Sequence, residues 1–224
     1  MKVIDPYFEI LYMPGGNEIM KHLELAARTC YKSEDRITED SAEAFLARII
    51  KSGHESVIEH ASVSVRIICD RGVSHELVRH RLCSFSQEST RYANYSKEKF
   101  GNEITVIRPF FFETGSEPYR EWETAMQACE RAYLSLLSAG AKAQEARSVL
   151  PNSLKTDIVV TANIREWRHI FKLRCSKASH PQMRQVMLPL LETFHSRIPV
   201  LFDTLYESHK HEISAFADRV APTA

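Results

Sequence analysis

The sequence lacks an excess of charge of either sign, and it lacks a long apolar run. Lysine and arginine together number 29, as do aspartate and glutamate, among 224 residues. No overall positive field therefore favours binding to a nucleic-acid backbone or to an anionic membrane. No apolar run approaches the roughly 20 residues of a membrane-spanning helix, and the start MKVIDPYFEI has a proline and two acids where a signal peptide has its apolar core. We expect a soluble, cytoplasmic protein that acts on neither nucleic acids nor membranes.

Paired cysteines, dinucleotide-binding glycines and metal-ligand spacings are also missing. The five cysteines are spread singly without a CxxC spacing, so they are expected to be reduced thiols. No GxGxxG motif occurs, and a Rossmann-type site finds no support. Several histidines and glutamates could suggest a metal site, but they lack the spacing of a helical HExxH pair and no cysteines have finger spacing, so no metal is expected. These residues are His54, His60, His75, His80, Glu55 and Glu59.

The chain of 224 residues, 44% apolar, is long enough to form one compact domain, and its patterning is that of an α+β fold. Helical spacing of apolar residues predicts helices at 17–31, 38–53, 75–82, 119–138, up to 150, 164–174, and from 181 with a kink or break near Pro189. Alternation predicts strands at 61–69, 103–108 and 156–162, and the polar run 84–99 is predicted to be a loop. Asn17 and Thr38 are the expected N-caps of the first two helices, and residues 220–224 are expected to fray.

The densest chemical segment is residues 79–92, RHRLCSFSQESTRY, with three arginines, a histidine and several hydroxyls. Guanidinium groups offer a planar fork of donors that suits phosphate oxygens, and serine hydroxyls can complete an anion site without adding charge. A phosphorylated small molecule is therefore the expected ligand. A solvated basic helix end followed by a polar loop is the alternative that this segment alone leaves open.

The same segment has the form R-H-R-x-x-S-x-x-x-x-S-x-R-Y and resembles the signature of the flavin-dependent thymidylate synthases. Three further blocks follow the order found in that family. They are GHESVIEH at 53–60, EARSVLP at 145–151, and NIREWRHIFKLR at 163–174 followed by SHPQM. The resemblance spans about residues 20–200.

The resemblance implies a fold, an activity and an assembly. The fold would have long helices around a central, mostly antiparallel sheet in a single domain over residues 1–224. The activity would be reductive methylation of dUMP to dTMP, with 5,10-methylenetetrahydrofolate as carbon donor and FAD, reduced by NADPH, as hydride donor. Tetrahydrofolate would be the folate product, and no enzyme nucleophile would be needed. The protein would be a homotetramer with active sites at subunit interfaces.

The resemblance also implies site residues at the matching positions. Contacts to FAD are expected from Ser56, Arg79, His80, Arg81, Gln87, Asn163, Ile164, Arg165 and His169. Contacts to dUMP are expected from Glu76, Arg79, Gln87, Glu88, Ser89, Thr90, Arg91, Arg147 and Arg174. Arg174 would be the catalytic residue, because its permanent positive charge could stabilise the uracil ring when N3 loses its proton.

Several of these residues also have simpler interpretations. Arg174 ends a predicted helix, where a cation stabilises the helix dipole without catalysis, and Arg147 could be a surface charge. The four matched blocks favour the ligand-binding role for both. Cys83 could be a nucleophile beside two cationic side chains, but it occupies a variable signature position and a small, partly buried thiol is favoured. Phe110–Phe112 could shelter a ring, although packing in the core or against another subunit is favoured.

Two other classes of function compete with the enzyme. A non-catalytic nucleotide- or phosphate-binding module would keep the arginines and lose turnover. An RNA- or DNA-binding domain would use residues 79–91 and bind polymers with strong salt dependence. The balanced charge disfavours the second class.

Overall fold

The computed structural model describes residues 1–217, which form two compact units. Unit 1 consists of Met1–Tyr7, Ile67–Arg79 and Phe85–Val159. Unit 2 consists of Phe8–Arg66, His80–Ser84 and residues 160–217. No helix within residues 1–217 combines the length and the apolar character needed to cross a membrane.

Two sheets provide the strand framework. A four-stranded antiparallel sheet has the order β2 (Tyr7–Tyr12), β3 (Ser62–Asp70), β6 (Lys155–Asn163), β4 (Ser84–Gln87). A second, parallel sheet pairs β1 (Lys2–Ile4) with β5 (Thr105–Ile107). In β3, Val63 and Val65 are fully buried while Ser62 and Ser64 are more exposed, which is the two-residue period of a strand. The predicted class, helices with an antiparallel sheet, is confirmed.

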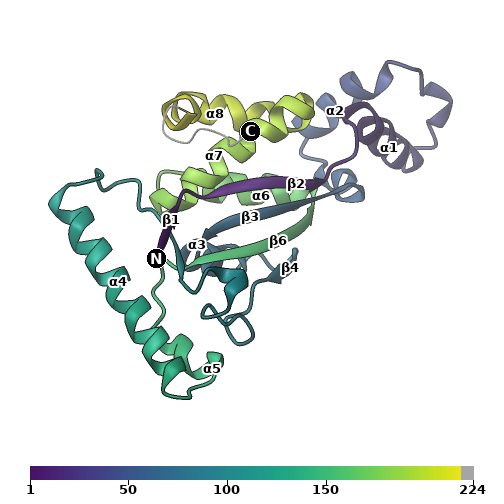
Figure 1. Ribbon diagram of the computed structural model, residues 1–224. Coiled ribbons are helices and arrows are strands. Elements are labelled where there is room, and N and C mark those ends of the chain that lie inside the picture. The colour runs from purple at the N-terminus through teal and green to yellow at the C-terminus, as the bar shows by residue number, and fades with distance from the viewer. Residues whose placement is uncertain (218–224) are drawn as a thin grey trace. The chain divides into compact units, whose positions relative to one another are not determined.

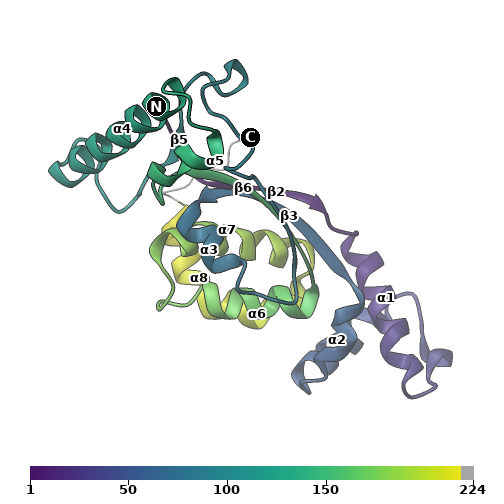
Figure 2. The same cartoon turned by 90° about the horizontal axis from the view of Figure 1, so that it is seen from below.

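Unit 2 carries most of the packed helices. Its helices are α1 (Gly16–Thr29), η1 (Glu34–Arg36), α2 (Ser41–Lys51), η2 (Glu55–His60), α6 (Ile164–Arg174), α7 (Pro181–Arg197) and α8 (Pro199–Ala217). Helix α6 lies along the strands of this unit, with α7 and α8 beyond it (Figure 1), and all three are on the same side of those strands (Figure 2). Their shared core is aromatic, since Trp167, Phe171, Phe194 and Phe202 are fully buried in contact with one another. This packing fixes which face of α6 is buried.

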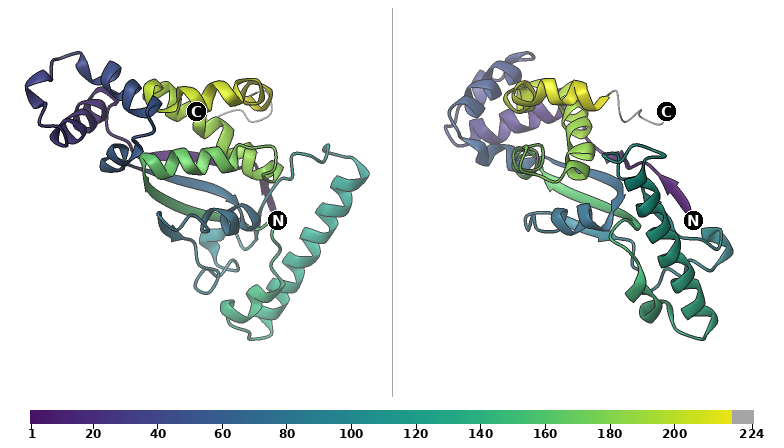
Figure 3. Two further views of the ribbon diagram at one scale, coloured as in Figure 1. Left: turned by 180° about the vertical axis from the view of Figure 1, so that it is seen from behind. Right: turned by 90° about the vertical axis from the view of Figure 1, so that its left-hand side faces the viewer.

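Unit 1 is built around one long helix. Its helices are α3 (Arg71–Leu77), η3 (Glu98–Phe100), α4 (Glu117–Ser138), α5 (Ala143–Ala146) and η4 (Arg147–Val149). Figure 3 shows α4 from two sides as a continuous helix, with the short α5 after its C-terminal end. The Ser116 hydroxyl accepts a hydrogen bond from the backbone N–H of Tyr119 and caps α4. Gly140 follows with a φ of +96°, a conformation that favours glycine at a helix end.

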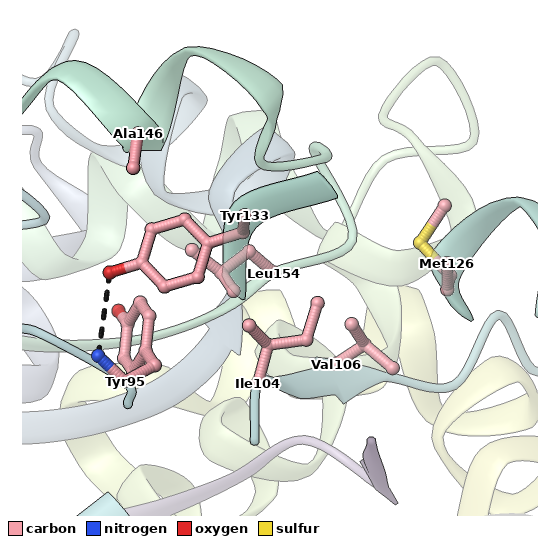
Figure 4. Packing of buried hydrophobic residues seen from close by; sticks show 7 residues of the cluster. All are labelled: Tyr95, Ile104, Val106, Met126, Tyr133, Ala146 and Leu154. Atoms are coloured by element: carbon pink, nitrogen blue, oxygen red, sulfur yellow. Dashed lines mark hydrogen bonds between the residues drawn. The ribbon is translucent and has the colours of Figure 1, made fainter. Parts of the chain in front are cut away.

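A compact hydrophobic cluster joins α4 and α5 of unit 1 to the strand and loop residues beside them (Figure 4). Its buried members are Tyr95, Ile104, Val106, Met126, Tyr133, Ala146 and Leu154. The Tyr133 hydroxyl accepts a hydrogen bond of 3.4 Å from the backbone N–H of Tyr95. The cluster thus contains one polar link between α4 and the loop that follows β4.

Replacing Tyr133 by phenylalanine is expected to lower the free energy of unfolding by about 1–2 kcal/mol, because the buried N–H of Tyr95 loses its acceptor. Urea denaturation of the two proteins measures this difference. Tyr31→Phe, at a side chain that is 73% exposed, is the control and should change stability by less than about 0.5 kcal/mol. Equal effects of the two substitutions would contradict the role given to the Tyr133 hydroxyl.

Most predicted elements are confirmed, but several of their ends were wrong. Helix α1 begins after Gly15, so Asn17 lies inside it, and α2 begins at Ser41 after Asp40 instead of at Thr38. The short helix predicted at 75–82 instead covers Arg71–Leu77, because the Asp70 carboxylate accepts from the N–H of Val73 at 2.7 Å. That cap sets the start of the helix earlier in the chain.

Two further predictions were wrong in part. The polar run at 84–99 begins with strand β4 before it becomes a loop. Helix α7 continues through Pro189, and the helical segment is interrupted at Ile198, just before Pro199. Strands β1 and β2 were not predicted. The expected fraying at 220–224 lies outside the residues that the structure describes.

Candidate functional site

Helix α6 of unit 2 is the element that positions most of the candidate site. It begins at Asn163, whose side-chain oxygen accepts from the N–H of Glu166 at 2.9 Å and caps the helix. One face of α6 is buried through Trp167 and Phe171. Glu166 and His169, three residues apart, share another face, as helical spacing requires.

A chain of two polar contacts runs across this helix through His80, which is only 5% exposed. Nδ1 of His80 lies 3.3 Å from Oε1 of Glu166. Nε of Arg174 donates to Nε2 of His80 at 3.0 Å. We call Glu166, His80 and Arg174 the α6 polar chain. It places a guanidinium in a defined orientation at the C-terminal end of α6.

The electrostatics of this chain keep the imidazole neutral. Burial, followed by repulsion from Arg174 and His169, lowers the pKa of His80 from 6.5 to about 4. The His169 ring stands edge-on to His80 with 5.7 Å between ring centroids. Burial raises the pKa of Glu166, and the nearby His169 opposes that rise. Neutral His80 can accept from Arg174 at Nε2 only while its proton is on Nδ1, on the side of Glu166.

The lowered pKa of His80 predicts a pH dependence of stability. Between the unfolded-state pKa of 6.5 and the folded-state value of about 4, the unfolded chain binds the proton more strongly, so stability is lost as the pH falls through this window. The full loss from this group is on the order of 3 kcal/mol. The raised pKa of Glu166 acts in the opposite direction, because the folded state then takes up that proton more readily.

Urea unfolding of the wild type and of His80→Gln across this pH range tests the expectation. The difference in stability between the two proteins should shift in favour of the variant as the pH is lowered. A difference that is independent of pH would mean that His80 titrates alike in the folded and unfolded states.

Among the residues that the structure describes, one group has a spacing that could hold a metal ion. Candidate ligand atoms of His80, Glu166 and His169 lie within 4.8 Å of one another. However, Nε2 of His80 already accepts from the cationic Arg174, and Nδ1 is directed at Glu166. A metal on either nitrogen would have to displace one of these contacts. The arrangement therefore favours the α6 polar chain over a metal centre.

A groove with a volume of about 820 Å³ opens beside this chain in unit 2. Three of the predicted cofactor residues, Asn163, Arg165 and His169, line it together with Glu166. Helix α8 contributes further polar groups, among them Ser208. The volume lies within the range of small-molecule sites.

Two ion pairs between η2 and α6 neutralise the acidic side of the groove. Glu55 pairs with Arg168 at 3.1 Å, and Glu59 pairs with Arg165. Arg168 also donates to the carbonyl of Leu201 in α8. These two glutamates are thus compensated by arginines.

In unit 1, the polar segment 87–91 is held by bonds to the start of β6. The Gln87 amide donates to the hydroxyl of Thr156 at 3.1 Å. The Glu88 carboxylate accepts from Lys155 at 2.8 Å and from the Tyr95 hydroxyl at 3.1 Å. These residues border a cavity of about 570 Å³ that Gln87, Glu88 and Lys155 line. The segment is therefore ordered by its own unit.

A second cavity of unit 1, of about 490 Å³, has the character of an anion site. Arg71, His75, Thr90 and Arg147 line it. Nη1 of Arg147 lies 3.4 Å from the hydroxyl of Thr90, and Arg71 donates to the carbonyl of Glu88. Two guanidinium groups and a hydroxyl at one cavity suit phosphate oxygens. Arg71 and His75 were not among the predicted site residues.

The predicted residues thus fall into two groups according to their unit. Unit 2 holds Ser56, His80, Arg81, Asn163, Ile164, Arg165, His169 and Arg174. Unit 1 holds Glu76, Arg79, Gln87, Glu88, Ser89, Thr90, Arg91 and Arg147. Most expected flavin contacts are in unit 2, and most expected nucleotide contacts are in unit 1.

Burial differs widely among the predicted residues. Ile164 is fully buried in the core and can offer only its backbone to a ligand. Ser56 and Arg81 are exposed and are not among the residues that line the groove of unit 2. Arg79 and Arg91 are also exposed. The roles of all these positions stay predictions.

Other candidate residues can be judged from their surroundings. Cys83 is half-buried, and burial followed by the charge of Glu166 raises its pKa to about 12, so the thiol is not activated as a nucleophile. Phe111 is 44% exposed and contacts Phe110 and Phe112 edge-on. The core interpretation of this cluster was therefore wrong for Phe111, and a subunit contact stays a prediction.

Glu166 is a further site residue that sequence reasoning missed, besides Arg71 and His75. It lies inside the matched block at 163–174, three residues before His169, so helical spacing already placed the two on one face. Its contact with His80 links positions 86 residues apart in sequence, which spacing alone does not reveal.

Known proteins resemble this chain over most of its length. The family model described as thymidylate synthase complementing protein matches residues 10–200. The flavin-dependent thymidylate synthase of Geobacter sulfurreducens is 37% identical over 185 residues, which cover 80% of this chain and 78% of that protein. That of Pyrococcus abyssi is 36% identical over 167 residues, covering 74% and 68%. That of Corynebacterium aurimucosum is 34% identical over 204 residues, covering 86% and 82%.

A solved structure has the same fold. The crystal structure of the UMP/dUMP methylase PolB from Streptomyces cacaoi, bound with 5-Br dUMP, superposes with a TM-score of 0.73. The match covers 93% of this chain and 97% of that one, at 22% sequence identity.

Proposed function

The chain belongs to the flavin-dependent thymidylate synthase family, and from this premise we propose that it converts dUMP to dTMP by reductive methylation. The observation that carries the proposal is the α6 polar chain, in which buried His80 holds the guanidinium of Arg174 through Nε. A fixed cation of this kind suits a substrate that becomes negatively charged during reaction. The groove of unit 2 lies beside it.

The donor set of unit 2 fits a flavin. The groove offers the amide of Asn163, the guanidinium of Arg165 and the imidazole of His169, and its volume of about 820 Å³ is large enough for a small-molecule cofactor. FAD would be held by these residues with Ser56, Arg79, His80, Arg81, Gln87 and the backbone of Ile164. Bound in its reduced form, the flavin would supply the hydride. The protein's task is to bind and orient the reactants.

The nucleotide would be bound mainly by residues of unit 1. Arg147 and Thr90, 3.4 Å apart at one cavity, suit the phosphate of dUMP. Ser89 and Arg91 would contribute on the phosphate side, and Glu76, Arg79, Gln87 and Glu88 would complete the contacts. Lys155 and Tyr95 already fix the carboxylate of Glu88, so its part is positional.

Arg174 would carry the chemical step on the pyrimidine. A guanidinium stays protonated at any working pH, so it can stabilise the uracil ring after N3 has lost its proton. That ionisation makes C5 a better nucleophile toward the one-carbon unit, and no enzyme nucleophile is required. The raised pKa of Cys83 supports a mechanism without a thiolate.

The remaining elements of the proposal follow from the family. The carbon donor would be 5,10-methylenetetrahydrofolate, NADPH would reduce the flavin, and tetrahydrofolate would be released. The protein would act in the cytoplasm as a homotetramer with active sites at subunit interfaces, and residues 1–224 would serve as one functional domain. Nucleic acids and membranes would not be partners.

The visible absorption spectrum of the purified protein, before and after anaerobic NADPH, tests the flavin. The oxidised flavin bands are expected at the start and should be bleached by NADPH, with and without dUMP. Formation of dTMP on addition of 5,10-methylenetetrahydrofolate then tests the reaction. A colourless protein that cannot be reconstituted with FAD would overturn the proposal, and a yellow protein that binds dUMP without making dTMP would indicate the non-catalytic module.

A further inference from the structure

We propose that Glu166 is a positioning residue for this reaction, which sets the orientation of Arg174 through the imidazole of His80. The inference rests on the proposed function, because it assigns Arg174 to the reacting pyrimidine. It concerns a residue outside the sets predicted to contact FAD or dUMP.

The geometry indicates that Glu166 acts on Arg174 through His80, because both contacts are made by the same imidazole ring. Glu166 and Arg174 are both on α6, eight residues apart, while His80 comes from the distant segment His80–Ser84 of the same unit. The side chains of His80 and Glu166 are 4% and 7% exposed. Water therefore competes little for either contact, and a buried polar group that loses its partner is costly.

The chain works only for one protonation state of His80. Nε2 must present its lone pair, because Nε of Arg174 is always a donor. The single proton of the neutral ring must then be on Nδ1, and Oε1 of the Glu166 carboxylate lies 3.3 Å from that nitrogen. The Glu166 carboxylate beside Nδ1 thereby favours the tautomer of His80 with its proton on Nδ1. In this tautomer Nε2 is free to accept from the guanidinium of Arg174.

The other charged groups that face His80 act in the same sense. Arg174 and His169 both disfavour a positive charge on the ring, and burial does so more strongly. Glu166 is the group that would favour such a charge, but its own pKa is raised by burial. The ring therefore stays neutral while Glu166 decides the position of its proton.

The first experiment observes His80 directly, in flavin-free protein with ¹⁵N-labelled histidine. In the wild type, NMR should show a neutral ring at His80 with the proton on Nδ1, assigned with the aid of the His80→Gln variant. In Glu166→Leu, which removes the acceptor and keeps a similar volume, the nitrogen shifts should move toward an average of the two tautomers. A wild-type ring with its proton on Nε2, or a tautomer unchanged in Glu166→Leu, would overturn the inference.

The second experiment separates positioning from stability. For Glu166→Leu we expect kcat per bound flavin to fall about tenfold or more, the equivalent of one hydrogen bond to a charged group. KM for dUMP should change by less than about threefold, since the phosphate contacts are unaffected. Glu166→Gln keeps an oxygen acceptor and should recover most of kcat.

A matched control is Glu24→Gln, at another buried carboxylate of unit 2. Glu24 accepts from Arg28 at 2.7 Å and is remote from the α6 polar chain in sequence and contacts. This variant should lower the melting temperature while kcat stays within about twofold of wild type. If Glu166→Leu also kept its kcat, the inference would fail while the proposed function stood. If the wild type made no dTMP, the proposed function would fail, and the NMR result would still decide whether Glu166 sets the tautomer.

Discussion

Replacing Arg174 by alanine is expected to lower kcat for dTMP formation by roughly two to three orders of magnitude, the usual effect of removing a preorganised group that stabilises developing charge. The flavin spectrum should be retained, because α6 begins at its Asn163 cap and packs through Trp167 and Phe171, none of which depends on Arg174. Stopped-flow kinetics measures the two half-reactions separately. Flavin reduction by NADPH should persist, and oxidation coupled to dUMP should be the step that fails.

Two further substitutions test whether the fall in kcat comes from the loss of the Arg174 guanidinium. Arg174→Lys keeps the charge but loses the planar group that His80 holds through Nε, and it should recover only a small part of kcat. Lys177→Ala removes a nearby cation whose side chain is 86% exposed, and it should leave kcat unchanged. If Arg174→Ala retained more than about a tenth of the wild-type kcat, stabilisation of the uracil ring by this residue would not be its main role.

Replacing Trp167 by alanine is expected to give the largest loss of stability among single substitutions in unit 2, about 3–5 kcal/mol. The indole is fully buried, with ring centroids 5.8 Å from Phe171 and 5.1 Å from Phe194. Its Nε1 also donates to the carbonyl of Val63 at 3.1 Å. Alanine would leave both a cavity between the helices and a strand carbonyl without this donor, and urea denaturation measures the sum.

The chain offers a second tryptophan as a matched control. Trp122 in α4 of unit 1 is only half-buried, and its Nε1 donates to the hydroxyl of Ser153 at 3.1 Å. Trp122→Ala should therefore cost less than half as much as Trp167→Ala, although both remove one indole and one hydrogen bond. Similar losses for the two would show that the difference in burial does not govern their contributions.

Long, regular elements could be predicted from the sequence because one face of each is buried. The apolar stripe of α4 and the alternation of β3 and β6 each report one buried face, so their positions were correct to within a few residues. Helix α6 was predicted with its full extent, 164–174. In these segments the spacing of the apolar residues alone indicates the type of secondary structure.

The missed strands have no such signal. In β2, Tyr7–Tyr12, apolar residues occur on both faces, and Leu11 and Tyr12 are 51% and 60% exposed, so no alternation marks the strand. Strand β1 pairs with β5, about a hundred residues away in sequence. Strand β4 is short and polar, and its pairing in the sheet comes from β6. Their existence depends on long-range hydrogen bonds that local patterns do not encode.

The candidate site divides in a similar way. The four matched blocks predicted candidate residues whose roles stay predictions, and the block at 163–174 contains two of the three residues of the α6 polar chain, Glu166 and Arg174. What sequence could not give was the pairing of His80 with Glu166 and Arg174, because the buried position of His80 depends on how its segment packs in unit 2. Sequence could likewise not show that Arg71 and Arg147 line the same cavity of unit 1, because they are far apart in the chain.

The two faces of α6 restrict how this part of the protein can evolve. Glu166 and Arg174 belong to the α6 polar chain, while Trp167 and Phe171 pack in the core. Neighbouring positions of α6 therefore require different kinds of side chain. Inserting or deleting one residue within the helix would rotate everything after it by about 100°. The aromatic side chains would then turn toward solvent and the charged ones toward the core, a double loss that no single compensating substitution repairs. Changes of length in this region should therefore be confined to the segment after Arg174, and descendants of this sequence should vary in α6 by substitution alone.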